Sequence, residues 1–373
     1  MKLAIVAPFS TKAALGFRIF NIAKRLKPAK IIFHARDRYG ESEKWQQNVE
    51  FLWWKKSLWL LKPHAWQIAW KARNCDLVYF FKPLPLNYSA AWILKNLFGK
   101  KIIFDFDEWE PYTQQEYVKG GANSARNRFV GGTLSWIGKA CANLSCCITT
   151  SNHRINDEIL HHKKCMLMPN GVDYEEYALE DAKGGKGKAS KPRPFALKKE
   201  VAYAGSLHYA ALLLPFLLQV PKGFKLHIWG EGKARDEIAY ALKQRGVDFE
   251  FHGYLKPDQL SRELKKFRGI FLAPYLPLQN IAYSSAGKMP QYMALGQPVI
   301  VSKVEGPMDY LMGKDCAYLI EPGQERKIGA LIEKIYADKN GAEKKAQVAQ
   351  KIVRQNFDWP AMCAKLEKFI AAC

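Results

Sequence analysis

Three carboxylates stand within four positions in Asp105-Phe-Asp-Glu108, directly after the run Lys-Ile-Ile-Phe. This run is typical of a buried strand, so the carboxylates are predicted to lie at its carboxyl end, where α/β proteins bind ligands. Carboxylates this close repel one another, which raises the pKa of at least one and suits it to accept a proton. We predict Asp107 as a general base and Asp105 and Glu108 as further catalytic candidates. An acidic helix N-terminus made of capping residues is the alternative interpretation.

Four glycine-containing turns each follow an apolar run in the second half of the chain. Glycine lets the backbone approach a ligand closely and adopt a positive φ, and backbone N–H groups at helix starts bind phosphate. A lysine beside the last turn adds a cation, although a simply solvated lysine is the alternative. Together the turns predict a site for a nucleoside diphosphate. The residues concerned are Gly205 with Ser206, Gly230, Gly253, and Gly287 with Lys288.

Lys82 follows a second apolar run, at positions 77–81, and precedes Pro83. If this run is a strand of the same sheet, Lys82 also lies at a carboxyl end. It is predicted to face an anionic acceptor or a phosphate, or else to begin a turn shaped by proline.

The elements that must position these residues alternate between strand and helix patterns. In the first half, strands are predicted at 3–8, 30–34, 77–81, 101–106 and 147–150, and helices at 16–26, 89–97 and 133–144. After the Lys- and Gly-rich segment 183–194, strands are predicted again at 201–203, 225–229, 249–252, 269–273 and 298–302. Short strands separated by helices predict parallel, doubly wound sheets, here in two α/β units. The closing segment 342–369 is predicted to be helical on both sides of Pro360, returning to the first unit or capping the second.

Composition limits the class of protein. The chain has 373 residues, of which 48% are hydrophobic, enough for two cores. Its eight cysteines form no CxxC pair, which predicts buried or inert thiols in a reducing compartment rather than disulfides or zinc ligands. No apolar run approaches the roughly 20 residues that a membrane span needs.

The formal net charge of +22 is concentrated near the amino terminus, where residues 1–100 hold 18 Lys and Arg against 5 Asp and Glu. A basic soluble surface, nucleic acid and an anionic membrane are the three readings. The region 51–73 mixes tryptophans with lysines, as interfacial helices do, and the chain lacks the common nucleic-acid-binding motifs. We therefore predict an anionic membrane surface as partner through residues 51–73, and no nucleic acid.

Five motifs in order resemble those of the group 1 glycosyltransferases, family 4-like enzymes with the GT-B fold. The resemblance implies two Rossmann-like doubly wound domains that face a cleft: an acceptor-binding domain at 1–174, a linker at 175–198, a nucleotide-sugar-binding domain at 199–356 and a crossover helix at 357–373. The motifs are Met168-Pro-Asn-Gly-Val-Asp173, Tyr203-Ala-Gly-Ser-Leu207, Leu226-His-Ile-Trp-Gly-Glu-Gly232, Phe251-His-Gly253 and Gly287-Lys-Met-Pro-Gln-Tyr-Met-Ala-Leu-Gly-Gln-Pro-Val299.

The activity that this resemblance implies is transfer of a hexose-like sugar from a UDP- or GDP-sugar to a glycan or lipid-linked acceptor, as in polysaccharide or glycolipid assembly. Neither a cofactor nor a metal is expected, because backbone amides and a lysine can neutralise the leaving diphosphate. The expected location is cytoplasmic, peripheral on the inner membrane face. The resemblance suggests retention of the anomeric configuration, while an Asp107 base leaves inversion open.

This chain also departs from the family pattern. Asp107 stands where many members have histidine, and Gly16 is the only glycine left in the loop that admits the acceptor. Tyr283 and Gln291 replace two glutamates of the donor site, and His208 is the only polar candidate where an arginine and lysine pair is common. These losses keep an alternative open, a non-catalytic relative that binds sugar nucleotides or acts as a scaffold at the membrane.

Overall fold

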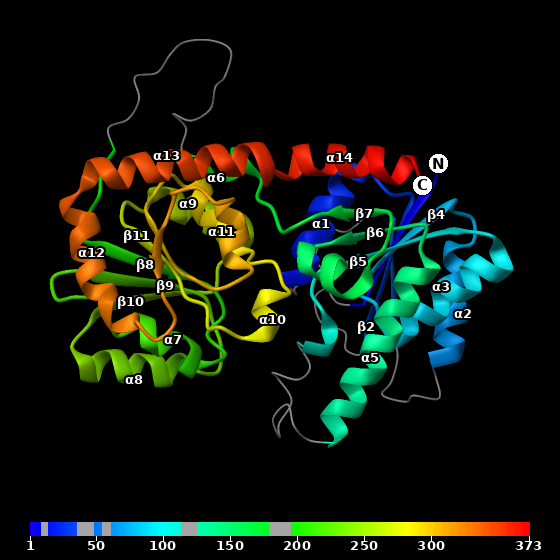
Figure 1. The fold of residues 1–373 in the computed structure, drawn as a ribbon, viewed down its shortest axis with the longest axis horizontal. Coiled ribbons are helices and arrows are strands. Elements are labelled where there is room, and N and C mark those ends of the chain that lie inside the picture. Colours follow the sequence, from blue (N-terminus) through cyan, green and yellow to red (C-terminus); the bar gives the residue numbers. More distant parts are fainter. Residues whose placement is uncertain (9–13, 36–47, 54–60, 113–124, 179–194) are drawn as a thin grey trace, which may run out of the picture. The chain divides into compact units, whose positions relative to one another are not determined.

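A computed structural model describes residues 1–8, 14–35, 48–53, 61–112, 125–178 and 195–373, which form two compact units (Figure 1). Unit 1 contains Met1–Asn170, Tyr283–Ser285 and Trp359–Cys373, and unit 2 contains Gly171–Ala282 and Ala286–Asp358. Most of the predicted linker 175–198, and residues 54–60 of the Trp- and Lys-rich region 51–73, lie outside the described residues.

Unit 1 is built on a parallel sheet of seven strands in the order β3-β2-β1-β4-β5-β6-β7. Every residue of β1 and β4 is buried, as expected for a parallel sheet covered by helices on both faces. The strands are β1 (Leu3–Ala7), β2 (Lys30–Ala35), β3 (Val49–Trp53), β4 (Leu77–Phe81), β5 (Lys101–Phe106), β6 (Cys147–Thr150) and β7 (Cys165–Leu167).

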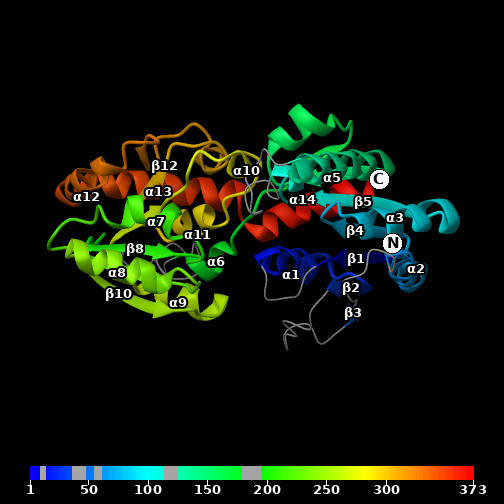
Figure 2. The same ribbon diagram turned by 90° about the horizontal axis from the view of Figure 1, so that it is seen from below.

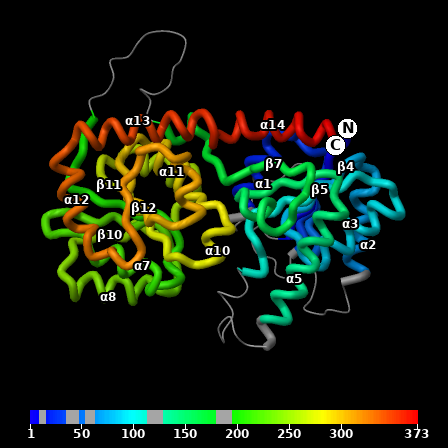
Figure 3. Tube along the Cα trace, viewed as in Figure 1, coloured from blue at the N-terminus to red at the C-terminus, as the bar shows by residue number. Residues whose placement is uncertain are grey.

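Helices of unit 1 pack in two groups. Figures 2 and 3 show α1 beside α14, and α3 between α2 and α5, in agreement with their contacts. The helices are α1 (Ala14–Leu26), α2 (Leu61–Ala72), α3 (Pro85–Phe98), α5 (Ala125–Leu144), the π-helix η3 (Ile155–Leu160) and α14 (Trp359–Ala371).

Unit 2 has a parallel sheet of six strands in the order β10-β9-β8-β11-β12-β13, again doubly wound. The strands are β8 (Glu200–Ala204), β9 (Lys225–Trp229), β10 (Asp248–Gly253), β11 (Ile270–Ala273), β12 (Val299–Ser302) and β13 (Tyr318–Ile320). The helices are α6 (Tyr174–Tyr177), α7 (Ala210–Leu217), α8 (Arg235–Arg245), α9 (Pro257–Lys266), α10 (Gln279–Ala282), α11 (Lys288–Ala294), η5 (Pro307–Leu311), η6 (Glu325–Lys327), α12 (Ile328–Ala337) and α13 (Lys339–Asn356).

The chain returns to unit 1 at its carboxyl terminus, which confirms that alternative of the sequence analysis. Helix α13 ends at Asn356, and α14 begins at Trp359, whose side chain is fully buried. Pro360 is the second residue of α14, where proline is tolerated because that N–H has no partner within the helix. The break therefore falls before Pro360, at Phe357 and Asp358.

One cysteine prediction is wrong. Cys146 and Cys373 form a disulfide with a Cα–Cα distance of 6.0 Å, while the other six cysteines are free. The two partners are separated by 227 residues, so no local spacing in the sequence could indicate the pair. The disulfide joins the start of β6 to the end of α14, within unit 1.

Candidate functional site

Asp105, at the end of β5, is fully buried against Arg18 of α1. The guanidinium binds both carboxylate oxygens, from Nε to Oδ2 at 2.9 Å and from Nη2 to Oδ1 at 2.8 Å. Thr149 also donates to Oδ1, at 2.6 Å, and Arg18 reaches the backbone oxygen of Met168 at 2.6 Å. A bidentate pair with its hydrogen bonds satisfied holds elements in place, so Asp105 positions the loop after β5 and is not available to a substrate.

Lys82 lies at the centre of the acidic loop. Its ammonium donates to Glu108 and Glu110 and stands 3.8 Å from Oδ1 of Asp107. Lys82 is 6% exposed and has a φ of +65°, an uncommon conformation for a residue other than glycine. The prediction that Lys82 faces an acceptor stays untested, but in the structure its single positive charge offsets part of the negative charge of three carboxylates.

Asp107 differs from the other acids of this loop. Its Oδ1 is buried and has no hydrogen-bond partner among the described residues. Burial, opposed by Lys82 and reinforced by the neighbouring carboxylates, raises the pKa of Asp107 to about 8. A carboxyl group whose pKa is near neutral and whose oxygen lacks a partner can exchange a proton with a bound hydroxyl.

The loop is framed by residues from distant parts of the sequence. Ser151, after β6, donates to the backbone oxygen of Asp107, and Trp109 donates its backbone N–H to Tyr283 O at 3.3 Å. Tyr283 belongs to unit 1, where its hydroxyl donates to Glu158. The structure thus places this predicted donor-binding residue beside the acidic loop. Gly16 lies in α1, where it is buried.

In unit 2, three of the predicted turns meet at the carboxyl ends of β8, β9 and β10. Gly205 donates to Trp229 O at 2.9 Å, and Gly230 donates to Gly253 O at 2.8 Å. Gly230 has a φ of +132°, and a Cβ there would stand only 1.9 Å from Gly205 O. Only glycine fits this contact, which brings the backbones of adjacent turns together.

Lys288, the first residue of α11, stands next to these turns. A Cβ on Gly205 would lie 3.2 Å from Lys288 Nζ, and Nζ lies 4.7 Å from the ring centroid of Tyr203 and 5.2 Å from that of Tyr275. Among the described residues no carboxylate pairs with Lys288, and burial lowers its pKa to about 8. The residue as a whole is partly exposed.

The remaining predicted donor residues of unit 2 lie near this lysine in the sequence or in the turn after β8. Ser206 and His208 are exposed in the turn after β8, Gly287 precedes α11, and Gln291 is partly exposed on it. The helix α11 has only seven residues. Backbone amides of the turns and the charge of Lys288 are of the chemical type that binds anions.

Sequence reasoning missed several residues that contact the acidic loop of unit 1 or Lys288 of unit 2. Arg18 and Thr149 hold Asp105, and Glu110 completes the cluster around Lys82. Tyr203 and Tyr275 face Lys288 with their rings. The acidic motif did contain a signal for Glu110, which stands two positions after Glu108, whereas the others come from distant strands and helices.

Residues 198–338 match the family model described as group 1 glycosyl transferases. This part of the chain is similar to a group 1 glycosyl transferase domain. The match confirms the resemblance drawn from the motifs. The matched segment contains the glycine turns, Lys288 and Gln291, whereas the acidic loop precedes it in the chain.

Solved structures establish the fold of the whole chain as GT-B. The chain is similar to HepE from Anabaena, crystallised with UDP and glucose, with 16% identity over 100% of both chains and a TM-score of 0.73. It is also similar to sucrose-phosphate synthase from Thermosynechococcus elongatus, with 14% identity over 100% of this chain and 99% of that one, and a TM-score of 0.73. A third similar structure is WaaG, a glycosyltransferase involved in lipopolysaccharide biosynthesis, with 14% identity over 99% of both chains and a TM-score of 0.66.

Among curated proteins, the chain is 22% identical over 264 residues to the glycogen synthase of Mycobacterium tuberculosis strain CDC 1551 / Oshkosh. The match takes in 68% of this chain and 60% of the relative. The glycogen synthase of strain H37Rv matches equally.

Proposed function

We propose that this protein transfers a sugar from a nucleotide-diphosphate sugar to an acceptor hydroxyl. The observation that carries the proposal is Lys288, a cation beside interlocked glycine turns that lacks a carboxylate partner among the described residues. A diphosphate would supply the missing negative charge, and the turns would supply N–H donors. The group 1 domain match and the UDP in similar structures support this donor class.

In the proposed reaction, unit 1 acts on the acceptor. Asp107 would take the proton of the attacking hydroxyl, since its Oδ1 lacks a hydrogen-bond partner among the described residues and its pKa is raised. Lys82, Glu108 and Glu110 hold the loop that presents it. No metal is required in this proposal, because Lys288 and backbone amides would stabilise the leaving diphosphate.

A direct test is to incubate the protein with a panel of nucleotide sugars, with and without membrane lipid extract, and to measure free nucleoside diphosphate. Release that rises when lipid extract is added would support transfer to a lipid-linked acceptor. Measurable nucleotide binding without release from any donor would overturn the enzyme proposal and favour the non-catalytic alternative.

We further propose that unit 1 attaches to an anionic membrane through the outer faces of α2, α3 and α5. These neighbouring helices contain no Asp or Glu and expose large apolar side chains. None of the described helices is long and apolar enough to cross a membrane. On this helical face the aromatic rings would enter the headgroup layer while the cations meet anionic lipid. Each cation contributes about 1 kcal/mol near such a surface. The exposed apolar residues are Trp66, Trp70, Trp92, Leu97, Phe129 and Trp136, and the cations include Lys95, Arg128 and Lys139, whereas Lys71 is paired with Glu50.

Vesicle sedimentation tests the attachment. Wild-type protein should pellet with vesicles containing anionic lipid and stay in solution with neutral vesicles. The double variant Trp92→Ser/Trp136→Ser should pellet less, whereas Tyr240→Ser, which removes an exposed aromatic ring from α8 of unit 2, should behave as wild type. Equal pelleting of the double variant and the wild type would exclude this face.

A further inference from the structure

Two histidines and a glutamate meet on one face of the unit 2 sheet, outside the residues assigned to the donor. Glu250 and His252 are two positions apart on β10, so their side chains leave the strand on the same side. His227 on β9 is the strand partner of Glu250. Each of the three offers a ligand atom within 4.8 Å of the other two.

The rings of the two histidines are arranged like a pair of metal ligands. His227 Nδ1 and His252 Nε2 face each other at 2.9 Å, and Glu250 Oε1 is 3.8 Å from His252 Nδ1. Two nitrogens at this distance share one proton, so at least one of them accepts and its ring has a lone pair available.

We propose that His227, His252 and Glu250 bind a Zn²⁺ ion. Two imidazoles and one carboxylate are a zinc-type ligand set, which leaves the fourth tetrahedral position for water. Zinc bonds of about 2.0–2.1 Å would place the two nitrogens about 3.3 Å apart, a small opening of the present contact. Within the part of the chain that the structure describes, the buried Nε2 of His227 has no hydrogen-bond partner, so no such bond resists the small ring rotation.

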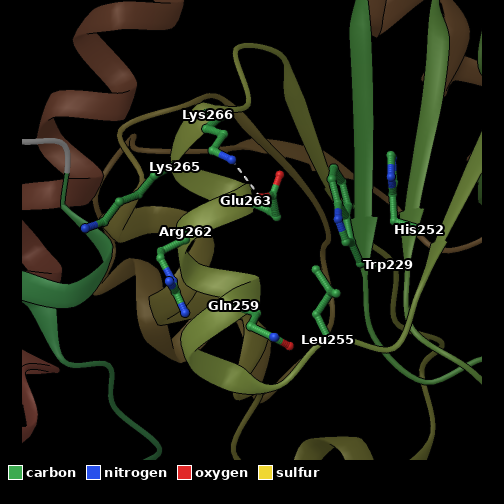
Figure 4. Close-up of a pocket in the computed structure, with 8 residues that line it drawn as sticks. All are labelled: Trp229, His252, Leu255, Gln259, Arg262, Glu263, Lys265 and Lys266. Atoms are coloured by element: carbon green, nitrogen blue, oxygen red, sulfur yellow. Dashed lines mark hydrogen bonds and ion pairs between the residues drawn. The ribbon is translucent and has the colours of Figure 1, made fainter.

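The proposed zinc site lies between a cavity and the glycine turns. Trp229 stacks on His252, with ring centroids 4.4 Å apart, and both line a cavity of about 660 Å³ beside α9 (Figure 4). The strands that carry the ligands lead directly into the turn contact between Gly230 and Gly253. A zinc ion that links β9 to β10 would therefore stabilise the turns of the proposed nucleotide site.

The test is calorimetric titration of metal-free protein with ZnCl₂, together with thermal unfolding in its presence. Wild type should bind one ion that Glu250→Gln and His252→Asn bind at least about tenfold more weakly. Glu250 is exposed, so Glu250→Gln tests the site without disturbing the core. His64→Ala, which removes a histidine of α2 in unit 1, is the matched control.

Lys225 offers a variant with the opposite effect. Its ammonium lies 2.7 Å from Glu250 Oε2 and competes for the carboxylate. Lys225→Met should therefore bind zinc more tightly than wild type, a gain that zinc bound to cysteines elsewhere would not show. Zinc affinity that is unchanged in Glu250→Gln, His252→Asn and Lys225→Met, or no zinc binding by the wild type, would overturn the proposal.

Discussion

Lys288 carries a positive charge that its surroundings make costly. Among the described residues its ammonium group has two tyrosine rings and the Tyr203 hydroxyl, at 3.5 Å, but no carboxylate, and its pKa is lowered to about 8 by burial. A bound diphosphate would reverse this cost, since an anion at hydrogen-bond distance favours the charged form. The affinity for nucleotide should thus depend on the protonation of this one side chain.

Replacing Lys288 by methionine should weaken UDP binding about tenfold to a hundredfold, the loss of a charge-assisted hydrogen bond worth about 1.5–3 kcal/mol. Wild-type affinity should fall as the pH rises above about 8, because free Lys288 then loses its proton, and Lys288→Met should lose this dependence. Isothermal calorimetry over a pH series measures both. Lys243→Met, at an exposed position of α8, serves as the control, and equal affinity in the two variants would remove Lys288 from the site.

Asp107 is the second residue whose protonation should affect a measurable quantity, in this case turnover. Asp107→Asn should lower turnover by about 10²–10⁴, the usual contribution of a general base, and leave nucleotide affinity unchanged. Wild-type turnover should rise with pH through about 8, because the raised pKa keeps Asp107 protonated below that value and a base must first lose its proton. Asp157→Asn, an exposed carboxylate of η3, should match the wild type. Full activity of Asp107→Asn would assign the proton transfer elsewhere.

At the scale of elements, the predictions that succeeded are those made by repeated local patterns. Buried strands such as β4 and β5 are short apolar runs, and glycines in the sequence mark the turns after β8 to β10. The missed elements β3, α2, β7 and β13 are edge strands or a helix with a mixed tryptophan and lysine pattern, in which partial burial blurs the periodicity. Burial of Asp105 by Arg18 is likewise invisible locally, because 87 residues separate the pair.

The contact of the glycine turns is testable by itself. Gly230→Ala should lower the free energy of unfolding by at least about 2 kcal/mol, because the new Cβ collides with Gly205 O and the positive φ is strained. Gly223→Ala has a φ of +82° but no atom within 4 Å of its Cβ, so it should show the backbone strain alone. Urea unfolding of both variants separates the two terms, and equal losses would argue against the close turn contact.

At the scale of the whole molecule, the carboxyl terminus ties α14 to unit 1 in two ways. The helix packs on α1, and the disulfide joins Cys373 to Cys146. Such a link restricts the conformations of the unfolded chain. It typically adds about 2–4 kcal/mol to the free energy of unfolding.

A reducing agent should therefore lower the unfolding temperature of the wild type and leave that of Cys373→Ser unchanged. Cys165→Ser, which replaces a free cysteine, should respond to the reducing agent as the wild type does. Thermal unfolding followed by circular dichroism provides the comparison. Eight titratable thiols in unfolded, unreduced wild-type protein would contradict the disulfide.

The central claim is that this GT-B protein forms a glycosidic bond. Transfer of radiolabelled sugar from a nucleotide sugar into an organic-soluble product of membrane lipid extract measures that bond directly. The account predicts labelled product with wild type, and strongly reduced labelling with Asp107→Asn and with Lys288→Met at a limiting donor concentration. Labelling by wild type that both variants match, or donor binding without any labelled product, would contradict it.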